Sequence, residues 1–567
     1  MTAQRSRECD VLVLGSGVGG LSTAIVATKN GLDCIIAEKE PVYGGTTAFS
    51  GGVLWIPGAR HCKQLAPNDT RDAARDYLKN ETGNFYQPDA VEALLDKGPE
   101  MLDWFERETE AKFVPTLYPD YHPNVGGGVD VGRSVLAAPY NSAVLGPELA
   151  RLRPPLATIT FIGMMFNSSN ADLKHFFNAT KSLTSFLYVT KRLASHIKDL
   201  AIYRRGVQVT SGNALVARLA KTVFDLKIPL LTSTPGKRLI VENGAVRGAV
   251  LEDGDGEIRV IARRAVVLAC GGFPHDVERL KKAYPHVARG GEHHSPTPAG
   301  NTGDGVRLAE TAGGHCDIRY PNAAAWMPVS RVPRRDGRFG VFPHLLDRYK
   351  PGVIAVTRKG KRFCNESESY HDVGAAMIEA CDGESETAAW LICDHPTIRK
   401  YGLGYAKPAP VPLQPHLASG YLVKAAALRE LGAKAGIDGE TLERTVAEYN
   451  AGARKGEDPQ FGRGSTAFNR YLADPEQKPN PCVGPIERGP YYALKLYMGD
   501  LGSFDGLSTD LYGQALNDAG QPIEGLYAVG NDRASMMGGN YPGAGITLGP
   551  IMTFAYIAGR RLAGLAD

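Results

Sequence analysis

The sequence predicts an α/β fold built around a central parallel sheet, and three observations near its beginning support this. The first segment is apolar at nearly every position from Val11 to Leu14, which is typical of a strand buried on both faces of a parallel sheet. The glycine-rich run GSGVGG follows, and a helix-like stretch then leads to a second apolar strand that ends at Glu38. Strand, helix and strand together make a βαβ unit.

The glycines of this unit have the spacing of a dinucleotide fingerprint. Gly15, Gly17 and Gly20 fit GxGxxG, in which absent side chains allow a tight turn, the approach of a pyrophosphate and close helix packing. Glu38 lies about 20 residues further on, where the fingerprint places the acid that accepts from a ribose hydroxyl. The glycine pattern alone is a weak signal. Combined with both strands, the helix and the acid, it strongly predicts dinucleotide binding.

The composition is that of a globular protein with more than one domain. The chain has 567 residues, of which 43% are hydrophobic and 22% charged, and its formal net charge is +3. It has no long basic run, so nucleic acid is not an expected partner. Its nine cysteines are scattered without zinc-ligand spacing, which predicts free thiols in a reducing cytoplasmic compartment and no metal. No apolar run approaches the roughly 18 residues needed to cross a bilayer.

Later segments predict a sheet that is completed from distant parts of the chain. Residues 239–273 read as a β-meander followed by an apolar strand, and residues 525–531 read as another buried strand. The stretch from Asn301 places Asp304 and Gly305 at a helix start. The expected organisation is a discontinuous dinucleotide domain, residues 1–275 and 485–567, around an α+β substrate domain, residues 276–484.

An insert at residues 154–205 fits neither domain. Its second half repeats apolar residues at helical spacing, with basic residues beside them. The apolar positions are Leu183, Phe186, Leu187, Leu193, Ala194, Ile197 and Leu200, and the basic ones are Lys191, Arg192, Lys198, Arg204 and Arg205. Such a helix lies in a membrane interface or packs on the body of the protein, and the pattern leaves both open. Peripheral membrane contact through this insert is therefore a hypothesis.

The run GGNYPGAGITLGP, residues 538–550, places the phenol of Tyr541 just ahead of a glycine-rich helix start. Backbone N–H groups at a helix start have no partner within the helix, so they can donate to an oxygen that carries negative charge. The alternative is an ordinary glycine loop that closes the last helix.

Three motifs spread over more than 400 residues support the first interpretation. They are YPDYHPNVGGGVDVGRS from Tyr118, GKRFCNESESY from Gly360 to Tyr370, and NYPGAG from Asn540 to Gly545. Through them the whole chain resembles the 3-ketosteroid Δ1-dehydrogenases, which belong to the FAD-dependent fumarate reductase/succinate dehydrogenase superfamily. Fumarate reductases carry arginines where this chain has Tyr370 and Tyr541. An arginine fork suits a carboxylate, whereas a phenol suits a neutral ketone.

The resemblance implies a reaction and four catalytic groups. The Tyr541 phenol and the backbone N–H of Gly545 would hold the 3-oxo group of a steroid or sterol 4-en-3-ketone. Tyr370, as a phenolate or through a relay with Tyr121, would take the proton from carbon 2 while hydride leaves carbon 1 for the flavin. An external electron acceptor would complete the turnover. Because a tyrosine has an ordinary pKa of about 10, a second phenol, a positive potential or an alkaline medium would have to help.

The same resemblance implies non-covalent FAD, since residues 43–52 resemble the FAD-contacting loop of that superfamily. The implied cofactor-binding residues are Gly15, Ser16, Gly17, Gly19, Gly20, Glu38, Lys39, Gly45, Thr46, Thr47, Ser50, Gly51, Gly52, Asp304, Gly305, Asn531 and Leu548. The sequence departs from the family pattern at His122, which follows Tyr121 where a second tyrosine is often seen, and at Ala544, where many members have proline. The alternatives are a related flavin desaturase or ene-reductase acting on another substrate, and a non-catalytic flavin-binding protein.

Overall fold

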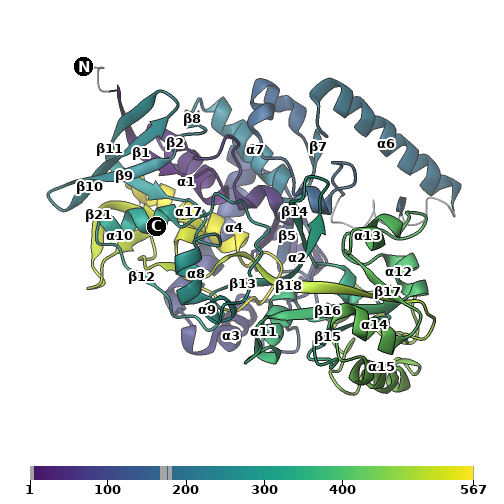
Figure 1. Ribbon diagram of the computed structural model, residues 1–567. Helices are drawn as coiled ribbons and strands as arrows, with labels where there is room; N and C mark the ends of the chain where they lie inside the picture. Colours follow the sequence, from purple (N-terminus) through teal and green to yellow (C-terminus); the bar gives the residue numbers. More distant parts are fainter. Residues whose placement is uncertain (1–4, 167–174, 177–181, 566–567) are drawn as a thin grey trace.

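The computed structural model describes residues 5–166, 175–176 and 182–565. Two β-sheets organise the chain, and Figure 1 shows them lying side by side with helices around each. The first sheet is built from residues 5–268 together with residues 514–528, and the second from residues 324–503. The predicted α/β class, with a second α+β unit inserted in the chain, is confirmed.

The first sheet is the predicted dinucleotide-binding sheet. Its strands are β1 (Arg5–Leu14), β2 (Cys34–Ala37), β8 (Leu230–Leu231), β9 (Gly236–Glu242), β10 (Ala245–Asp253), β11 (Gly256–Leu268), β20 (Gln514–Leu516) and β21 (Pro522–Ala528). β1 lies between β2 and β11 and runs parallel to both, and β21 runs parallel to β11. β9, β10 and β11 pair antiparallel as the expected meander. Segments far apart in the sequence therefore share one sheet.

Helices surround this sheet and the smaller sheet beside it. They are α1 (Val18–Lys29), α2 (Arg60–Leu65), α3 (Arg71–Thr82), α4 (Pro88–Glu108), α7 (Ser211–Asp225), α10 (Asp304–Thr311) and α17 (Leu548–Leu562). α1 contacts both α7 and α17, and its residues from Val18 to Ala27 are all buried, so this helix has no polar face toward water. A small sheet of β3 (Val53–Trp55), β4 (Phe113–Pro115) and β5 (Ser134–Ala137) lies beside them.

The second sheet is entirely antiparallel. It contains β13 (Ala324–Pro333), β14 (Phe339–Pro343), β15 (Val353–Thr357), β16 (Ala388–Asp394), β17 (Val423–Ala425) and β18 (Tyr491–Ser503). β18 lies at its centre, between β13 and β16. This pairing places residues 491–503 in the second sheet, beyond residue 485, at which the dinucleotide domain is expected to resume.

The remaining elements connect and cover the two sheets. They are α8 (Val277–Ala283), α9 (Pro285–Ala288), α11 (Tyr370–Ala380), α12 (His395–Tyr401), α13 (Gln414–Ala418), α14 (Leu428–Ala435), α15 (Gly439–Ala453), α16 (Ala467–Tyr471), and the short pairs β6 (Tyr140–Asn141) with β7 (Gln208–Val209) and β12 (Cys316–Asp317) with β19 (Gly506–Leu507). α11 packs on β13, which brings its first residue, Tyr370, to the boundary between the two units.

The insert forms one long helix, α6 (Leu183–Tyr203), which extends away from the body in Figure 1. The helical spacing predicted for this segment is confirmed, whereas residues 167–174 and 177–181 of the insert lie outside the described residues. Among its side chains, Ser185 and His196 are buried, while Leu183, Phe186, Leu187 and Ile197 are 54–74% exposed. Within the described residues, no helix is long and apolar enough to cross a bilayer.

Candidate active site

The glycines of the fingerprint form a cradle that only a chain without side chains can make. Gly15 has a φ of +112°, and a Cβ there would collide with the carbonyl oxygen of Ala269 at the end of β11. A Cβ at Gly20 would collide with the carbonyl oxygen of Gly15. α1 begins directly after Gly17, and its first N–H, on Val18, donates to Thr47 Oγ1 at 3.1 Å. The helix start thus faces the predicted phosphate-binding turn.

Residues expected at the ribose and pyrophosphate meet from three separate segments. Glu38 accepts from the N–H and hydroxyl of Ser16, and the Ser16 hydroxyl also accepts from the N–H of Gly44 at 3.0 Å. Lys39 forms an ion pair with Asp304, the first residue of α10. These contacts place the fingerprint, the residues 43–52 loop and the start of α10 around one site.

Two neighbours of Asp304 join this site although the sequence analysis did not single them out. Asn301 Nδ2 donates to Thr46 Oγ1 at 2.8 Å, and Lys39 Nζ donates to Thr302 Oγ1 at 2.8 Å. Both residues belong to the NTGDG stretch, so their closeness to Asp304 in the sequence could have identified them as residues of this site.

Other expected cofactor residues lie at the edges of the same region. A Cβ at Gly305 would collide with the carboxylate of Asp532, which follows Asn531 and accepts from the N–H of Gly272 at 3.0 Å. Burial raises the pKa of Asp532 to about 6.

The residues 43–52 loop also meets α7. A Cβ at Gly52 would collide with the backbone of Ser211 in α7, and Ser50 Oγ accepts from the N–H of Gly52 at 3.2 Å. Gly51 precedes Gly52 directly, and Gly45 precedes the 3-10 helix of Thr46–Phe49 with a φ of +50°. Gly19 packs beside Gly530, and Leu548 is the first residue of α17. The cradle, its acid and its helix starts fit FAD.

The three tyrosines implied as catalytic meet in one buried cluster although they are far apart in sequence. The rings of Tyr121 and Tyr541 stack with their centroids 5.6 Å apart, and Tyr370 lies edge-on to both, at 6.0 Å and 5.1 Å. All three are at least 91% buried. Besides burial, interactions with the hydroxyls of Tyr121 and Tyr541 are among the causes that raise the pKa of Tyr370.

Backbone contacts hold the loops of Tyr121 and Tyr541 together. The carbonyl oxygen of Pro542 accepts from the N–H of Tyr121 at 2.8 Å and from the hydroxyl of Tyr77 at 2.6 Å. Asp120 forms an isolated β-bridge with Gly543. Two loops that are separated by more than 400 residues are therefore joined directly beside the stacked rings.

His371, the neighbour of Tyr370, fixes helix α11 against the same loop. Its Nε2 donates to the carbonyl oxygen of Gly539 at 3.1 Å, and its Nδ1 accepts from the N–H of Trp326 at 3.2 Å. Burial lowers the pKa of His371 to about 4, so the imidazole is neutral and can accept at one nitrogen while it donates at the other. The position of Tyr370 relative to Tyr541 is thereby set by neighbouring bonds.

Gly545 follows Tyr541 at the turn before α17 and has a free backbone donor. Its φ is +92°, and a Cβ there would lie 2.5 Å from the carbonyl oxygen of Val53. Its own carbonyl oxygen accepts from the N–H of Trp55 at 3.1 Å. In the part of the chain that the structure describes, the N–H of Gly545 donates to no protein group. A two-donor arrangement with the phenol of Tyr541 is thus available to a ligand oxygen.

The electrostatics of the phenols differ from the expectation. Burial raises the pKa of Tyr370 and of Tyr121 well above the ordinary value of 10. The neighbouring phenols Tyr121 and Tyr541 raise that of Tyr370 further, whereas hydrogen bonding with Tyr370 lowers that of Tyr121. Burial also raises the pKa of Tyr541. For Tyr370 itself a second phenol therefore gives no help, because Tyr121 and Tyr541 both raise its pKa.

The walls around the tyrosines are aromatic. Phe468 lies 4.4 Å from Tyr121, Phe504 lies 6.2 Å from Tyr541, and Tyr349 lies 5.9 Å from Phe468, all between ring centroids. Neither phenylalanine belongs to a motif in the sequence, so nothing there predicted them. Such walls favour an apolar ring as the ligand.

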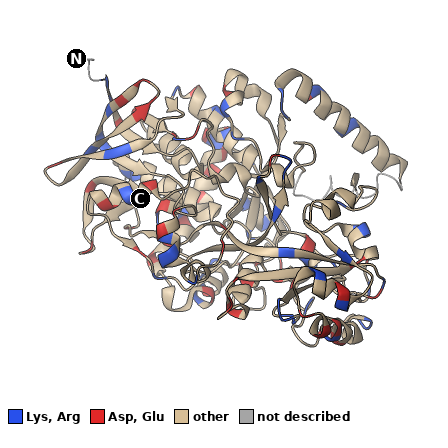
Figure 2. Cartoon of the chain, viewed as in Figure 1, with Lys and Arg blue, Asp and Glu red and all other residues tan. Residues whose placement is uncertain are grey.

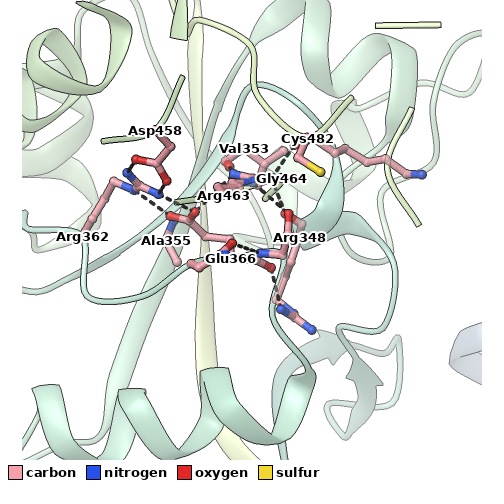
Figure 3. Close-up of polar contacts among 12 residues, drawn as sticks. Arg348, Val353, Ala355, Arg362, Glu366, Asp458, Arg463, Gly464 and Cys482 are labelled. Carbon is pink, nitrogen blue, oxygen red and sulfur yellow. Dashed lines mark hydrogen bonds and ion pairs between the residues drawn. The ribbon is translucent and has the colours of Figure 1, made fainter. Parts of the chain in front are cut away.

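The GKRFCNE motif forms a buried ion cluster below this site rather than part of it. Figure 3 shows Arg362 facing both Glu366 and Asp458, with its Nη2 2.7 Å from Glu366 Oε2 and 2.8 Å from Asp458 Oδ2. Arg463 contacts Glu366 and also donates to the carbonyl oxygen of Arg348 at 2.6 Å. Burial alone would neutralise Glu366, but the two arginines hold its pKa below the usual value. The cluster fixes the loop that leads to Tyr370.

Replacing Glu366 with glutamine is expected to lower the free energy of unfolding by about 3 kcal/mol, because it leaves two buried guanidinium groups short of negative charge. Chemical denaturation at neutral pH measures this. Glu384→Gln is the control, since Glu384 pairs with Lys359 at the surface and its loss should leave stability nearly unchanged. Equal stability of the Glu366 variant and the wild type would contradict the assignment.

Comparisons with known proteins agree with this geometry. The family described as "FAD binding domain" matches residues 10–548. A 4-oxocyclohex-2-ene-1-carboxylate 5-dehydrogenase of Sinomonas cyclohexanicum is 44% identical, covering 99% of this chain and 94% of its own. A 3-oxosteroid 1-dehydrogenase of Mycobacterium tuberculosis is 36% identical over the full length of both chains. The crystal structure of a 3-ketosteroid Δ1-dehydrogenase from Sterolibacterium denitrificans, in complex with 1,4-androstadiene-3,17-dione, has a TM-score of 0.90 at 34% identity, covering 98% of this chain and 100% of its own.

The fold and the site define a flavoprotein oxidoreductase that acts on CH–CH groups. FAD is its cofactor, and the expected family resemblance is confirmed. The chain belongs to the FAD-binding domain family and, within it, to the 3-ketosteroid Δ1-dehydrogenases.

Proposed function

We propose that this enzyme desaturates a 3-oxosteroid between carbons 1 and 2, converting a 4-en-3-one to a 1,4-dien-3-one. The observation that carries the proposal is the meeting of Tyr121, Tyr370 and Tyr541 in one buried aromatic cluster, with the unpaired N–H of Gly545 on the same loop as Tyr541. Two donors aimed at one oxygen suit a ketone, because they stabilise the enolate character that develops as the adjacent carbon loses a proton.

Each side chain then has a separate task. Tyr541 and Gly545 hold the ketone, which acidifies the hydrogen on carbon 2. Tyr370 accepts that proton as a phenolate, and its contact with Tyr121 offers a path for the proton to leave. When bound, FAD supplies the acceptor for the hydride from carbon 1. An external electron acceptor is needed to complete the turnover.

A second candidate substrate has support from one relative. The 44% identical protein is named for a ring ketone that carries a carboxylate, 4-oxocyclohex-2-ene-1-carboxylate. Both reactions remove hydrogen from adjacent carbons beside a ring ketone, so the same tyrosines would serve either. The aromatic walls made by Phe468, Phe504 and Tyr349 favour the steroid, because they offer an apolar surface to a fused ring system.

Anaerobic flavin bleaching distinguishes the candidates. The enzyme with FAD bound is mixed separately with androst-4-ene-3,17-dione, cholest-4-en-3-one, 4-oxocyclohex-2-ene-1-carboxylate and succinate, and the loss of flavin absorbance is followed. We expect rapid bleaching by the steroids. Bleaching by the cyclohexene carboxylate alone would support the second candidate, and bleaching by succinate alone would overturn the ketone assignment.

We also propose the extent of the two units and of the cofactor site. The FAD unit comprises residues 1–275 and returns near residue 504, because β18 pairs with β13 and β16 in the second sheet. The residues from the fingerprint, the residues 43–52 loop, the start of α10, Asn531 and Leu548 would hold FAD without a covalent bond. Their mutual contacts support this assignment.

Helix α6 supports a proposal of membrane contact at the cytoplasmic face. Its apolar face, defined by Leu183, Phe186, Leu187 and Ile197, is exposed, whereas polar Ser185 and His196 turn toward the body. Figure 2 shows basic residues along the same helix, and Lys191 and Lys198 lie next to the apolar face. Exposed apolar side chains beside lysines suit an anionic lipid surface.

Replacing both Leu187 and Ile197 with glutamate should abolish binding to vesicles, because it puts charge into the proposed apolar contact. Sedimentation with phosphatidylglycerol vesicles measures the bound fraction, and the wild type should bind these more than phosphatidylcholine vesicles. Replacing Val241 and Val277 with glutamate is the control, since both are exposed apolar residues outside α6. Binding that survives the α6 changes would contradict the proposal.

A further inference from the structure

His122 occupies the centre of a charged bridge directly behind the tyrosine cluster. Its Nδ1 lies 2.9 Å from Glu81 Oε2 and its Nε2 lies 3.1 Å from Asp372 Oδ2, so both ring nitrogens donate to carboxylates. Its backbone N–H donates to the hydroxyl of Tyr77, which itself donates to Pro542. No polar atom of this residue is left to contact a substrate directly.

The bridge joins the elements that carry the proton-transfer tyrosines. His122 follows Tyr121 in the chain, Asp372 lies two residues after Tyr370 in α11, and Glu81 lies in α3. Ser369, the residue that caps α11, donates to the same Oδ2 of Asp372 at 2.6 Å. Glu81 and His122 belong to the FAD unit, whereas Asp372 belongs to the inserted unit. The bridge therefore crosses the boundary between the two units.

The surrounding charges favour an imidazolium at this position. Burial opposes the charge, but the bonds to Asp372 and Glu81 overcome it and raise the pKa of His122 to about 11. The other titratable groups nearby are Glu368, whose carboxylate lies within 4.8 Å of the ligand atoms of His122 and Asp372, and His371 on the far side of Asp372. Because both nitrogens of His122 already face carboxylates, the cluster is an ion bridge rather than a metal site.

We propose that His122 is a positioning residue, which locks the Tyr121 loop of the FAD unit to the Tyr370 helix of the inserted unit and so fixes the geometry of proton removal from carbon 2. This inference rests on the proposed function. Tyr121 and Tyr370 come from different units, and within the cluster their ring centroids lie 6.0 Å apart with the rings edge-on. A small rotation of one unit would separate them, and a displacement of about 1 Å can cost on the order of 10²-fold in rate.

The test compares three variants under steady-state conditions. His122→Gln removes the charge and one of the two donors, whereas His122→Arg keeps a cation that can reach both carboxylates. His61→Gln is the control, because His61 also pairs with a carboxylate, Glu106, but lies in α2 away from the tyrosines. FAD content and melting temperature are measured for each variant, and Glu81→Gln replaces His122→Gln if that variant does not fold.

We expect His122→Gln to lower kcat by on the order of 10²-fold with KM within about twofold. The kinetic isotope effect from substrate deuterated at carbon 2 should rise, since proton removal becomes slower, and His122→Arg should recover most of the rate. His61→Gln should match the wild type. The inference is overturned if His122→Gln keeps the wild-type rate and isotope effect, or if His122→Arg recovers nothing. A wild type that oxidises neither ring ketone would overturn the proposed function itself.

The charge of His122 can also be tested by how the melting temperature depends on pH. Because the pKa of His122 is raised in the folded state, its stabilising contribution is complete below its ordinary pKa of about 6.5 and is lost as the pH rises toward 11. The difference in melting temperature between the wild type and His122→Gln should therefore narrow from pH 6.5 to pH 10. A difference that stays constant would contradict a charged bridge.

Discussion

Replacing Tyr370 with phenylalanine is expected to lower kcat by on the order of 10⁴-fold, because it removes the group that accepts the proton from carbon 2. The ring keeps its edge-on contacts with Tyr121 and Tyr541, so only the hydroxyl is lost. FAD should stay bound, since Tyr370 lies in the inserted unit and its ring contacts are with Tyr121 and Tyr541 rather than with described residues of the fingerprint. Stopped-flow measurement of flavin reduction by androst-4-ene-3,17-dione reports the change.

The pH dependence of the wild-type rate is a second test of Tyr370 as the group that accepts the proton. Burial raises the pKa of Tyr370 above 10, and a base must be deprotonated to act. The rate should therefore rise about tenfold for each pH unit from pH 7 toward pH 10, in proportion to the phenolate fraction. Tyr449→Phe is the control, because the hydroxyl of Tyr449 is buried without a hydrogen-bond partner among the described residues. A Tyr370→Phe variant that retains the alkaline rise would remove Tyr370 from its role.

Local patterns in the sequence were sufficient to predict several strands of the first sheet. In the βαβ unit, the meander and the late parallel strand, nearby residues determine both the spacing of apolar residues and the ends of each element. All three are present in the structure. Local patterns did not predict which sheet β18 joins. Its apolar run would fit either sheet, and only its pairing with β13 and β16 decides between them. The residue at which the chain changes units was therefore not predictable from the run itself.

In the candidate active site, too, the sequence predicted residues that lie in local motifs but not those placed by contacts between distant segments. Tyr121, Tyr370 and Tyr541 were named because motifs surround them, and the structure brings them together. Phe468 and Phe504 have no motif, and their place beside the tyrosines depends on packing between distant segments. His122 was noted only as a departure from the family pattern, because its two carboxylate partners lie 41 and 250 positions away.

The apolar face of α6 shows why a helical period does not reveal its partner. The spacing predicted the helix correctly, but an apolar face has the same sequence pattern whether it packs on protein or contacts lipid. In this chain the exposed fractions of Leu187 and Ile197 are 58% and 65%, so these two side chains of the face are largely uncovered.

Replacing Tyr541 with phenylalanine should lower the rate of flavin reduction by about 10²- to 10³-fold, since it removes one of the two donors to the ketone oxygen. Gly545 keeps its N–H, so a residual rate should persist. Absorbance at the flavin maximum checks that FAD is retained, and Tyr449→Phe again serves as the control. Unchanged steroid oxidation would contradict the two-donor arrangement.

The two tyrosine variants can be told apart by pH. A ketone donor must stay protonated, and burial raises the pKa of Tyr541 above its ordinary value of about 10, so its hydroxyl still donates from pH 7 toward pH 10. Tyr541→Phe should therefore be slow at every pH but keep the alkaline rise that belongs to Tyr370. Tyr370→Phe should lose the rise itself. If both variants kept the rise, the base would have to be a third group, and Tyr121, stacked on Tyr541, would be the next residue to replace.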